Sequence, residues 1–471
     1  MSEWAGQWHN QSISAAAADL QEHLDTNRHP LIQKVPLHLR QTRTFEKFYL
    51  PKMFSFGPIH YGQTKLMFGE TLKLKLALHF VNTNNIFQPK LIGVIKENLK
   101  RIKKCYDNSV IAIDDEELAG MLFVDGCAVV HLIYCIIFEE DIFSRELKMK
   151  KDQIAFAQHD MFLLENQLPF LLLNLVIDSA SSSTRYKKAV TEFVRVNLMV
   201  SGEDPYASSG KYNRENSSVI VFSDEESPIH LLDLMRERLI AHVKDKKSRI
   251  GKASSYISKL YKCICSACEK KLGFREKGEL EINGVKNWQS FRSVNDLMES
   301  GVKFLPSKKI SLRNVRMEGF WFTAVVKLPM VTMDDSTPAK LFNLVAYETC
   351  PDFENEFEVI SYVSLMDSLI DETGDVRELR RAGILQNALG NDQEVADIFN
   401  EISENLASNP EIYGSVIKKL EMRYNSKVQT AMAEFVHNHF RSPWTFLAFL
   451  GVIVGLGLSF VQTVYTIHPA A

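Results

Sequence analysis

The chain has little net charge of either sign. Its 55 Lys and Arg residues are nearly balanced by 58 Asp and Glu residues, which leaves a formal net charge of −3 at pH 7. Without an excess of positive charge there is no general attraction for phosphate backbones, so we expect no nucleic-acid partner. The N-terminus also lacks a basic stretch followed by an apolar run, and Ser2 stands where N-myristoylation needs glycine. We therefore expect neither a signal peptide nor that lipid anchor.

The sequence lacks the short motifs that carry common chemistries. H-E-x-x-H, G-x-S-x-G and G-x-G-x-x-G are all absent. The segment GPIHYGQT approaches a phosphate-binding loop, but Gln63 stands where that loop needs lysine to contact the phosphates. The seven cysteines are scattered, and the cluster Cys263, Cys265 and Cys268 has no fourth zinc ligand nearby. We therefore expect free thiols, no catalytic, cofactor-binding or metal residue, no cofactor and no enzyme activity.

Charge is missing altogether from residues 444–467, close to the C-terminus. In a helix these 24 residues rise about 36 Å, which exceeds the ~30 Å of a bilayer's hydrocarbon core. A buried core helix is the alternative, but such helices seldom run this long without a charge. We predict a transmembrane helix over residues 443–467, with Trp444 and Tyr465 as anchors at the two interfaces.

The residues in and around this span predict its orientation in the membrane and a contact between two copies of the chain. Basic residues precede the span and none follows it. The positive-inside rule then places the bulk of the chain on the cytosolic side, as in a tail-anchored, single-pass protein. Gly451 and Gly455 form a small-xxx-small pair, which suits a homodimer through two spans. Which membrane receives the span is left open.

Composition and periodicity divide the rest of the chain. Residues 1–30 are polar and predicted to be disordered, and residues 31–200 read as a helical N-terminal half. A variable linker is expected at 201–228, and a basic insertion at 244–277 holds eleven Lys and Arg against three acidic residues. Residues 290–440 form the predicted C-terminal half, so the segment from 31 to 440 reads as one large domain.

The predicted fold class is mainly α (α+β). Apolar residues recur at three- and four-residue steps through most of the domain, as in amphipathic helices. A β-rich segment of two to four strands is expected near 302–333, where β-branched and aromatic residues alternate with polar ones. Two long helices, over about 392–408 and 410–440, are predicted to lead up to the membrane span.

One polar group interrupts an otherwise apolar segment. Asp160, Glu165, Asn166 and Gln167 lie in HDMFLLENQLPFLLLNLVI, and Pro169 stands where a new helix could begin. If buried, such groups must be hydrogen-bonded, since an unsatisfied one costs about 1–3 kcal/mol. We interpret them as a structural polar motif, with Asn166 or Gln167 capping the helix that starts near Pro169. The alternative is an acid–base pair of the two carboxylates.

Several blocks of the sequence resemble those of one plant family, the domain of unknown function 247, also called uncharacterised protein family 0481. The blocks are VPLHLR (35–40), FSFGPIHYG (54–62), MLFVDGCAVVHL (121–132), DMFLLENQLPF (160–170), HLLDLMR (230–236), VNDLMESGVKF (294–304), NLVAYETC (343–350), the segment 360–385 and the terminal segment 442–467. Two positions depart from the usual blocks, the run Ile59-His60-Tyr61 and Ala128.

The resemblance implies a plant protein with a C-terminal membrane anchor and no established enzymatic activity. Some members lie at grass self-incompatibility loci and are implicated there as pollen-side determinants. We therefore expect a membrane-anchored protein that acts by protein–protein recognition or signalling, with an unknown protein partner. The alternatives are an enzyme that uses Asp160 and Glu165, and an adaptor that binds anionic lipid through residues 244–277.

Overall fold

The computed structural model describes residues 31–202, 228–241, 293–320, 323–404 and 406–424, together with a few helical residues between 451 and 462. The predicted disordered N-terminus, nearly all of the variable linker, the basic insertion with its cysteine cluster, and the anchors Trp444 and Tyr465 lie outside the described residues. Gly451 and Gly455 are described, and both are exposed residues of a helix.

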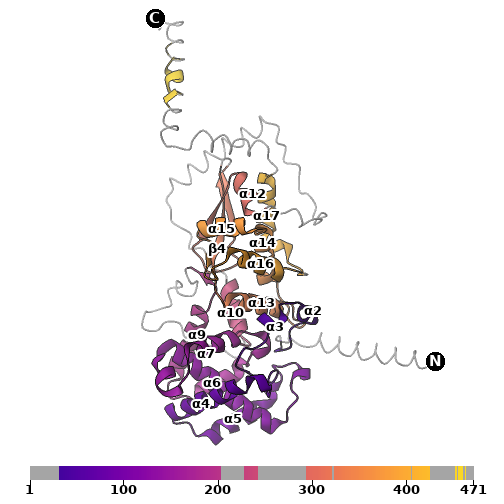
Figure 1. The fold of residues 1–471 in the computed structure, drawn as a ribbon, viewed down its shortest axis with the longest axis vertical. Coiled ribbons are helices and arrows are strands. Elements are labelled where there is room, and N and C mark those ends of the chain that lie inside the picture. Colours follow the sequence, from indigo (N-terminus) through magenta and orange to yellow (C-terminus); the bar gives the residue numbers. More distant parts are fainter. Residues whose placement is uncertain are drawn as a thin grey trace, which may run out of the picture.

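The molecule is elongated, with a helical lobe at one end and a lobe containing a sheet at the other (Figure 1). The helical lobe is built from the N-terminal half of the chain. Its elements are α4 (Met67–Thr83), α5 (Gln88–Lys103), α6 (Asp115–Phe138), α7 (Lys151–Asp160), α8 (Phe170–Ser179) and α9 (Ser183–Val196), with short turns η1 (Thr64–Leu66), η2 (Asn108–Val110), η3 (Phe143–Leu147) and η4 (Leu164–Asn166).

Helix α6 forms the centre of the helical lobe. Asp114 caps it by accepting hydrogen bonds from the N–H groups of Glu116 and Glu117, and α4, α5, α8 and α9 all pack against it. Among the described residues it is the single helix that is long and apolar enough to cross a membrane, but 78% of its most apolar window is buried inside the protein. This is weak evidence for a span, because the core helix of a folded domain has the same length and composition.

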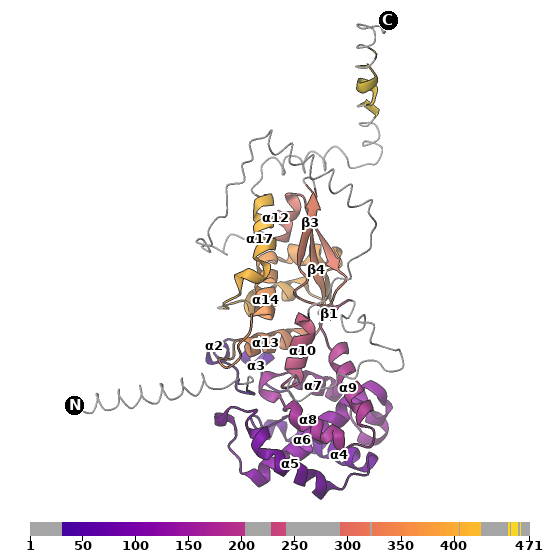
Figure 2. The ribbon, with the colours of Figure 1, turned by 180° about the vertical axis from the view of Figure 1, so that it is seen from behind.

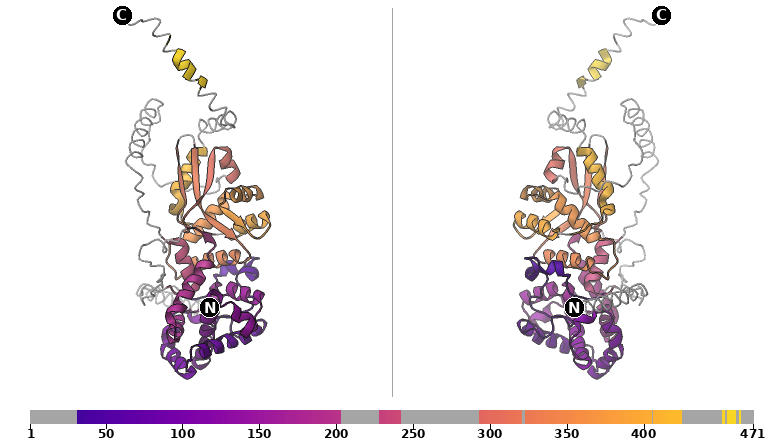
Figure 3. Two further views of the ribbon diagram at one scale, coloured as in Figure 1. Left: turned by 90° about the vertical axis from the view of Figure 1, so that its left-hand side faces the viewer. Right: turned by 90° about the vertical axis from the view of Figure 1, so that its right-hand side faces the viewer.

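The second lobe surrounds a five-stranded mixed sheet, seen from the side in Figure 3. Its elements are α12 (Val294–Glu299), β2 (Val302–Ser307), β3 (Arg316–Phe320), β4 (Thr323–Met333), α14 (Glu358–Leu369), α15 (Thr373–Arg381), β5 (Leu385–Asn387), α16 (Asp392–Ile402) and α17 (Pro410–Tyr424), and the edge strand β1 (Val200–Ser201) arrives from the end of α9. Helix α12 contacts β2 and α17 contacts β3, as Figure 2 shows from behind.

Strand β4 organises the whole sheet because every other strand pairs with it. Its first half lies between β2, which is parallel, and β3, which is antiparallel; Val326 pairs with Phe304 on one side and Met317 on the other. Its second half lies between antiparallel β1 and parallel β5, where Val331 pairs with Val200 and Leu385. An eleven-residue strand rich in β-branched residues is suited to this central place.

Four helices join the two lobes: α2 (Leu37–Arg40), α3 (Phe45–Phe48), α10 (Leu231–Ile240) and α13 (Thr337–Glu348). The rings of Phe48 and Phe342 stack at 4.5 Å, and Asn343 donates to the carbonyl of Phe48 at 2.8 Å. The same Asn343 accepts from the N–H of Leu164 at 2.8 Å. One continuous apolar core therefore runs through both lobes, and the N-terminal segment is part of it.

The mainly helical fold class and the small sheet are confirmed, with differences in detail. Three of the strands fall near 302–333 as predicted, but β1 and β5 add strands at 200–201 and 385–387. The helix predicted over 392–408 ends at Ile402. A strand of two or three residues is too short to show an alternation of apolar and polar residues in the sequence. These two strands form because β4 offers them a pairing partner.

Candidate functional site: a polar groove beside His159

The polar motif of the sequence lies at the end of α7 and holds the neighbouring segment 52–57 by its backbone. Asp160 is buried, and its carboxylate accepts hydrogen bonds from the N–H groups of Lys52, Met53 and Phe54 at 2.9, 2.8 and 2.8 Å. A carboxylate is the strongest acceptor available for such N–H groups. The backbone of this segment is therefore fixed in place by a side chain more than a hundred residues away.

Asn166 extends the same arrangement. Its side-chain oxygen accepts from the N–H of Phe56 at 2.7 Å, and its amide donates to the carbonyls of Phe54 and Asp160, both at 2.9 Å. All the hydrogen-bonding capacity that a buried amide must satisfy is thereby used on backbone groups.

Glu165 ties the N-terminal segment to this centre. It accepts from the N–H of Val35 at 2.8 Å, pairs with Arg40, and lies 3.2 Å from Nε2 of His60. Gln63 donates to Nδ1 of His60, so the ring proton is on Nε2 and faces the carboxylate. Burial alone would raise the pKa of Glu165, but the bonds from His60 and Val35 and the charge of Arg40 outweigh it and hold the pKa below its usual range.

The predicted capping of the helix after Pro169 is wrong in its partners. Helix α8 begins at Phe170 with Pro169 as its N-cap, no side chain caps it, and Phe170 donates to the carbonyl of Ile229 at 2.7 Å. Gln167 instead accepts from the N–H of Leu232 at 3.1 Å, in the first turn of α10. The reason is geometric: Gln167 is extended and points across to a different helix.

A buried Lys73–Asp125 pair supports the same segment, and sequence reasoning did not single it out. Asp125 accepts from Nζ of Lys73 at 2.5 Å and from the N–H of Gly57 at 2.8 Å. Gly57 has φ +76, and a Cβ there would approach the carbonyl oxygen of Gln167 to 3.0 Å. Burial raises the pKa of Asp125 to about 6, with Lys73 opposing the shift. The sequence feature that could have identified the pair is Asp125 itself, a charged residue within the otherwise apolar helix α6.

Two adjoining cavities open on the other side of these contacts. The first, of about 440 Å³, lies between the end of α3, the segment 50–52 and η1, and it is lined by Glu46 as well as by Lys47, Lys52 and Lys65. The second, of about 400 Å³, runs along α7 to the start of α13 and is lined by Glu140, Lys151 and Asp334. His159 and Asp335 line both cavities, and we call the two cavities together the groove. The first is its basic section, where lysines outnumber carboxylates, and the second is its acidic section, where carboxylates outnumber lysines.

His159 stands where the two sections meet, and Asp160 fixes its ring. The distance from Nδ1 of His159 to the Asp160 carboxylate is 3.0 Å, so the Nδ1 proton faces the carboxylate. Nε2 of this ring has no hydrogen-bond partner among the described residues. Asp160 therefore orients the imidazole and, through its three backbone bonds, the segment that carries Lys52.

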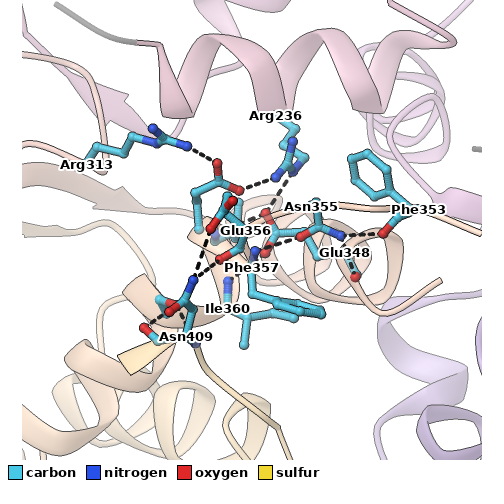
Figure 4. A network of polar contacts seen from close by, with 12 residues as sticks. Arg236, Arg313, Glu348, Phe353, Asn355, Glu356, Phe357, Ile360 and Asn409 are labelled. Atoms are coloured by element: carbon cyan, nitrogen blue, oxygen red, sulfur yellow. Dashed lines mark hydrogen bonds and ion pairs between the residues drawn. The ribbon is translucent and has the colours of Figure 1, made fainter. Parts of the chain in front are cut away.

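A second buried network lies at the junction of α10, α13 and α14 (Figure 4). Arg236 donates to Glu348 at 2.7 Å and pairs with Glu358, which also pairs with Arg313. Glu348 accepts from the N–H groups of Val359 and Ile360 and so holds the first turn of α14. These contacts pair every charge, and neither of the two cavities described above is lined by these residues.

The segment before α14 is held by amides of the same network. Asn355 donates to the carbonyls of Glu348 and Phe353 at 2.9 Å and accepts from the N–H of Phe357 (Figure 4). Phe357 has φ 56, a left-handed conformation that costs free energy for a residue with a side chain. The network stabilises this turn, which is a structural role.

Asp160 and Glu165 do not form an acid–base pair facing a cavity. Neither lines the groove, and each carboxylate is occupied by backbone N–H groups or by cationic and imidazole partners. Among the described residues there is also no cluster of His, Cys, Asp and Glu that could hold a metal ion.

The DUF247 family, described as a plant protein of unknown function, matches residues 32–458. The chain belongs to this family. Its blocks around His60, Asp125, Asp160 and Asn343 are the ones whose side chains meet in the contacts above.

Two curated DUF247 relatives come from Arabidopsis thaliana. The chain is similar to UPF0481 protein At3g47200, with 26% identity over 439 residues, 89% of this chain and 83% of that protein. It is also similar to Putative UPF0481 protein At3g02645, with 21% identity over 479 residues, 88% and 86% of the two chains. No solved structure matches the chain.

Proposed function

We propose that this DUF247 protein is a membrane-anchored recognition protein without catalytic activity, and that its groove binds a segment of a protein partner. Residues 443–467 anchor it as a single C-terminal span, and the described lobes face the cytosol. The observation that carries the proposal is the groove beside His159, whose lining carries many charges of both signs. The basic side chains are Lys47, Lys52, Lys65 and Lys151, and the acidic ones are Glu46, Glu140, Asp334 and Asp335.

Opposite charges in one groove favour recognition of a charged, extended chain. Complementary charges steer association and fix the register of a bound segment more than they add affinity. The groove is also made by parts of the chain that are far apart, so its shape depends on the fold being intact. These features suit a surface that selects a partner.

An enzyme is the second candidate, and the His159–Asp160 pair is the observation that favours it. A carboxylate that orients an imidazole beside a cavity is the usual arrangement of a general base. The hydroxyl in the groove, Ser336, donates to Asp334 at 2.7 Å instead of to His159. A nucleophile activated by His159 is therefore absent from the described lining, which supports binding over acyl transfer.

The lipid-adaptor alternative and the role in self-incompatibility stay predictions. The first depends on residues 244–277, which lie outside the described part of the chain. It is tested by binding of the protein to liposomes with and without anionic lipid, at low and high salt. The second depends on which locus encodes the chain and on tests in pollen.

Site-specific photo-crosslinking in plant membranes tests the groove. A photoreactive phenylalanine replaces Lys65, which lines the basic section, or Lys90, an exposed residue of α5 outside the groove. We expect a discrete protein adduct from position 65 and none from position 90. The adduct should disappear when Lys47 and Lys52 both carry glutamate, with an unchanged melting temperature of the purified chain.

Adducts of the same size from both positions would contradict the proposal, because contact would then be unselective. An adduct from position 65 that survives the charge reversal would also contradict it, since the basic wall would play no part. His159→Ala distinguishes a binding protein from an enzyme. For a binding protein, we expect the variant to capture less of the partner. We also expect no substrate to accumulate in membranes that contain the variant, as it would if an enzyme had been inactivated.

A further inference from the structure

Helix α4 presents an apolar face to solvent, although it lies on the outside of the helical lobe. Met67, Phe68, Leu74 and Leu78 are all on this face, and each of them is more than half exposed. The exposed residues of the next helix, α5, are by contrast mainly charged, as is usual for a surface helix. A contiguous apolar stripe of this kind marks a contact surface, since its exposure to water is unfavourable.

The spacing of residues on this face is that of a coiled-coil seam. Met67, Thr71, Leu74 and Leu78 follow one another at steps of four, three and four residues. These are the steps between alternating d and a positions of a heptad repeat, so the four side chains form one line along the helix. The hydroxyl of Thr71 donates to the carbonyl of Met67 at 3.3 Å, which leaves the methyl group of Thr71 available for packing.

The charged residues beside the seam favour a second copy of the same helix as its partner. With Leu74 at a d position, Glu70 occupies a g position and Lys75 an e position. In a parallel pair of helices, the g position of one helix meets the e position of the next heptad in the other, so Glu70 of each copy would lie beside Lys75 of the other copy. In an antiparallel pair, Glu70 and Lys75 would be on opposite sides of the seam and could not meet.

Both the charges and the seam are available for this contact. Glu70 lies 2.8 Å from Nζ of the buried Lys73, but 21% of its side chain is exposed at the edge of the seam. None of the four seam residues lines the groove. Helix α4 belongs to the helical lobe, at the end of the molecule opposite to the sheet (Figure 1). Pairing through α4 therefore uses a surface separate from the lining of the groove.

We propose that two copies of the chain associate through parallel α4 helices, with Met67, Leu74 and Leu78 in the seam and Glu70 of each copy beside Lys75 of the other. A seam of less than two heptads gives a weak dimer in solution. Anchoring both copies in one membrane raises their effective concentration, so the dimer forms there. The inference goes beyond the proposed function and gives the anchored assembly two copies of the groove.

Cysteine crosslinking of the full chain in plant membranes tests the inference. Met67→Cys places a thiol at a d position, which lies opposite its own copy in a parallel pair. In an antiparallel pair, with Met67 opposite Leu78, the two thiols would be roughly 16 Å apart along the helix. We expect mild oxidation of Met67→Cys to give at least about fivefold more disulfide-linked dimer than the natural chain, whose own cysteines set the background. Lys96→Cys, an exposed position of α5, is the matched control and should stay at background.

Two further changes, made in the Met67→Cys chain, separate the seam from chance collision. Leu78→Lys should reduce the crosslinked dimer by about tenfold, because a charge then enters an a position of the seam. Lys75→Glu should reduce it severalfold by bringing two acidic side chains together, whereas Lys75→Arg should preserve it. Leu78 and Lys75 are exposed, so the melting temperature of the purified chain should not change.

A crosslink from Lys96→Cys that equals the one from Met67→Cys would overturn the inference, as would a crosslink that survives Leu78→Lys. A dimer that forms only between a Met67→Cys chain and a Leu78→Cys chain would also overturn it, because that pairing is antiparallel. If position 67 gives no dimer while photo-crosslinking from position 65 still captures a partner, the α4 inference fails and the proposed function stands.

Discussion

At the scale of single residues, the buried carboxylates act as acceptors for backbone groups. Asp160 uses both oxygens on the segment 52–54, and Glu165 uses its oxygens on Val35, Arg40 and His60. The sequence predicted that these groups are hydrogen-bonded, because an unsatisfied buried carboxylate is too costly. It could not predict the partners, which lie more than a hundred residues away and are unrelated to any local pattern.

The depressed pKa of Glu165 makes part of the stability dependent on pH. In the unfolded chain a glutamate titrates near ~4.3, and in the folded protein it titrates lower. Its stabilising contribution is therefore complete above about pH 5 and is lost as the pH falls through the folded-state pKa. We expect Glu165→Gln to cost about 1–3 kcal/mol in the free energy of unfolding at pH 7, and expect this difference from the natural chain to shrink below pH 4.

Denaturant unfolding followed by circular dichroism at several pH values measures this difference. The matched control is Glu97→Gln, an exposed glutamate on α5, which should change stability little at any pH. A cost of Glu165→Gln that stays constant from pH 7 to pH 3 would contradict the assignment, because the charge of the carboxylate would then be irrelevant.

At the scale of elements, the segment clamped by Asp160 lies directly against α4. Gly69 is the contact point: a Cβ at this position would come within 2.1 Å of the carbonyl oxygen of Met53. Backbone atoms cannot move aside as a flexible side chain can, and Asp160 already holds this stretch. The three- and four-residue steps of apolar residues predicted helices in this half of the chain, but the sequence had no signal for which turn of α4 approaches the segment 52–54.

Gly69→Ala should therefore destabilise the protein by about 3 kcal/mol or more, although alanine is the better helix former. Gly120→Ala in α6 is the matched control, since a Cβ there meets nothing within 4 Å. We expect that control to stabilise by up to about 1 kcal/mol. Melting temperatures of the two variants measure both effects, and a neutral Gly69→Ala would show that α4 and the segment 52–54 are less tightly packed.

At the scale of the whole molecule, the two lobes share one core, and the groove lies where they meet. Lys65 belongs to the helical lobe, Lys47 to the joining helix α3, and Asp335 to the turn before α13. Helix α3 packs on α13 through Phe48 and Phe342. The groove therefore depends on residues that the sequence separates by almost three hundred positions.

The predicted membrane anchor concerns the whole molecule, because it decides on which side of a membrane both lobes lie. With tags at both termini in sealed microsomes, protease should remove the N-terminal tag, and the C-terminal tag should be shielded. Leu456→Lys with Leu458→Lys should release the protein into carbonate extracts, because each charge at the centre of a span costs roughly 2.5–3.5 kcal/mol. The control pair Leu456→Ile and Leu458→Ile should remain in the membrane pellet, and an N-terminal tag that is shielded would reverse the orientation.

The sequence by itself determined the helical class, the place of most helices, the family and the presence of polar groups that must be buried with partners. These properties depend on local periodicity and on the free-energy cost of an unsatisfied polar atom, and both can be judged from residues that are close together in the sequence. Only the tertiary structure decided that Asp160 holds the segment 52–54, that Gln167 accepts a hydrogen bond from the first turn of α10 instead of capping α8, and that three lysines line the cavity beside His159. Such choices depend on which distant backbone groups come within hydrogen-bonding distance, and a linear pattern holds no information on that distance.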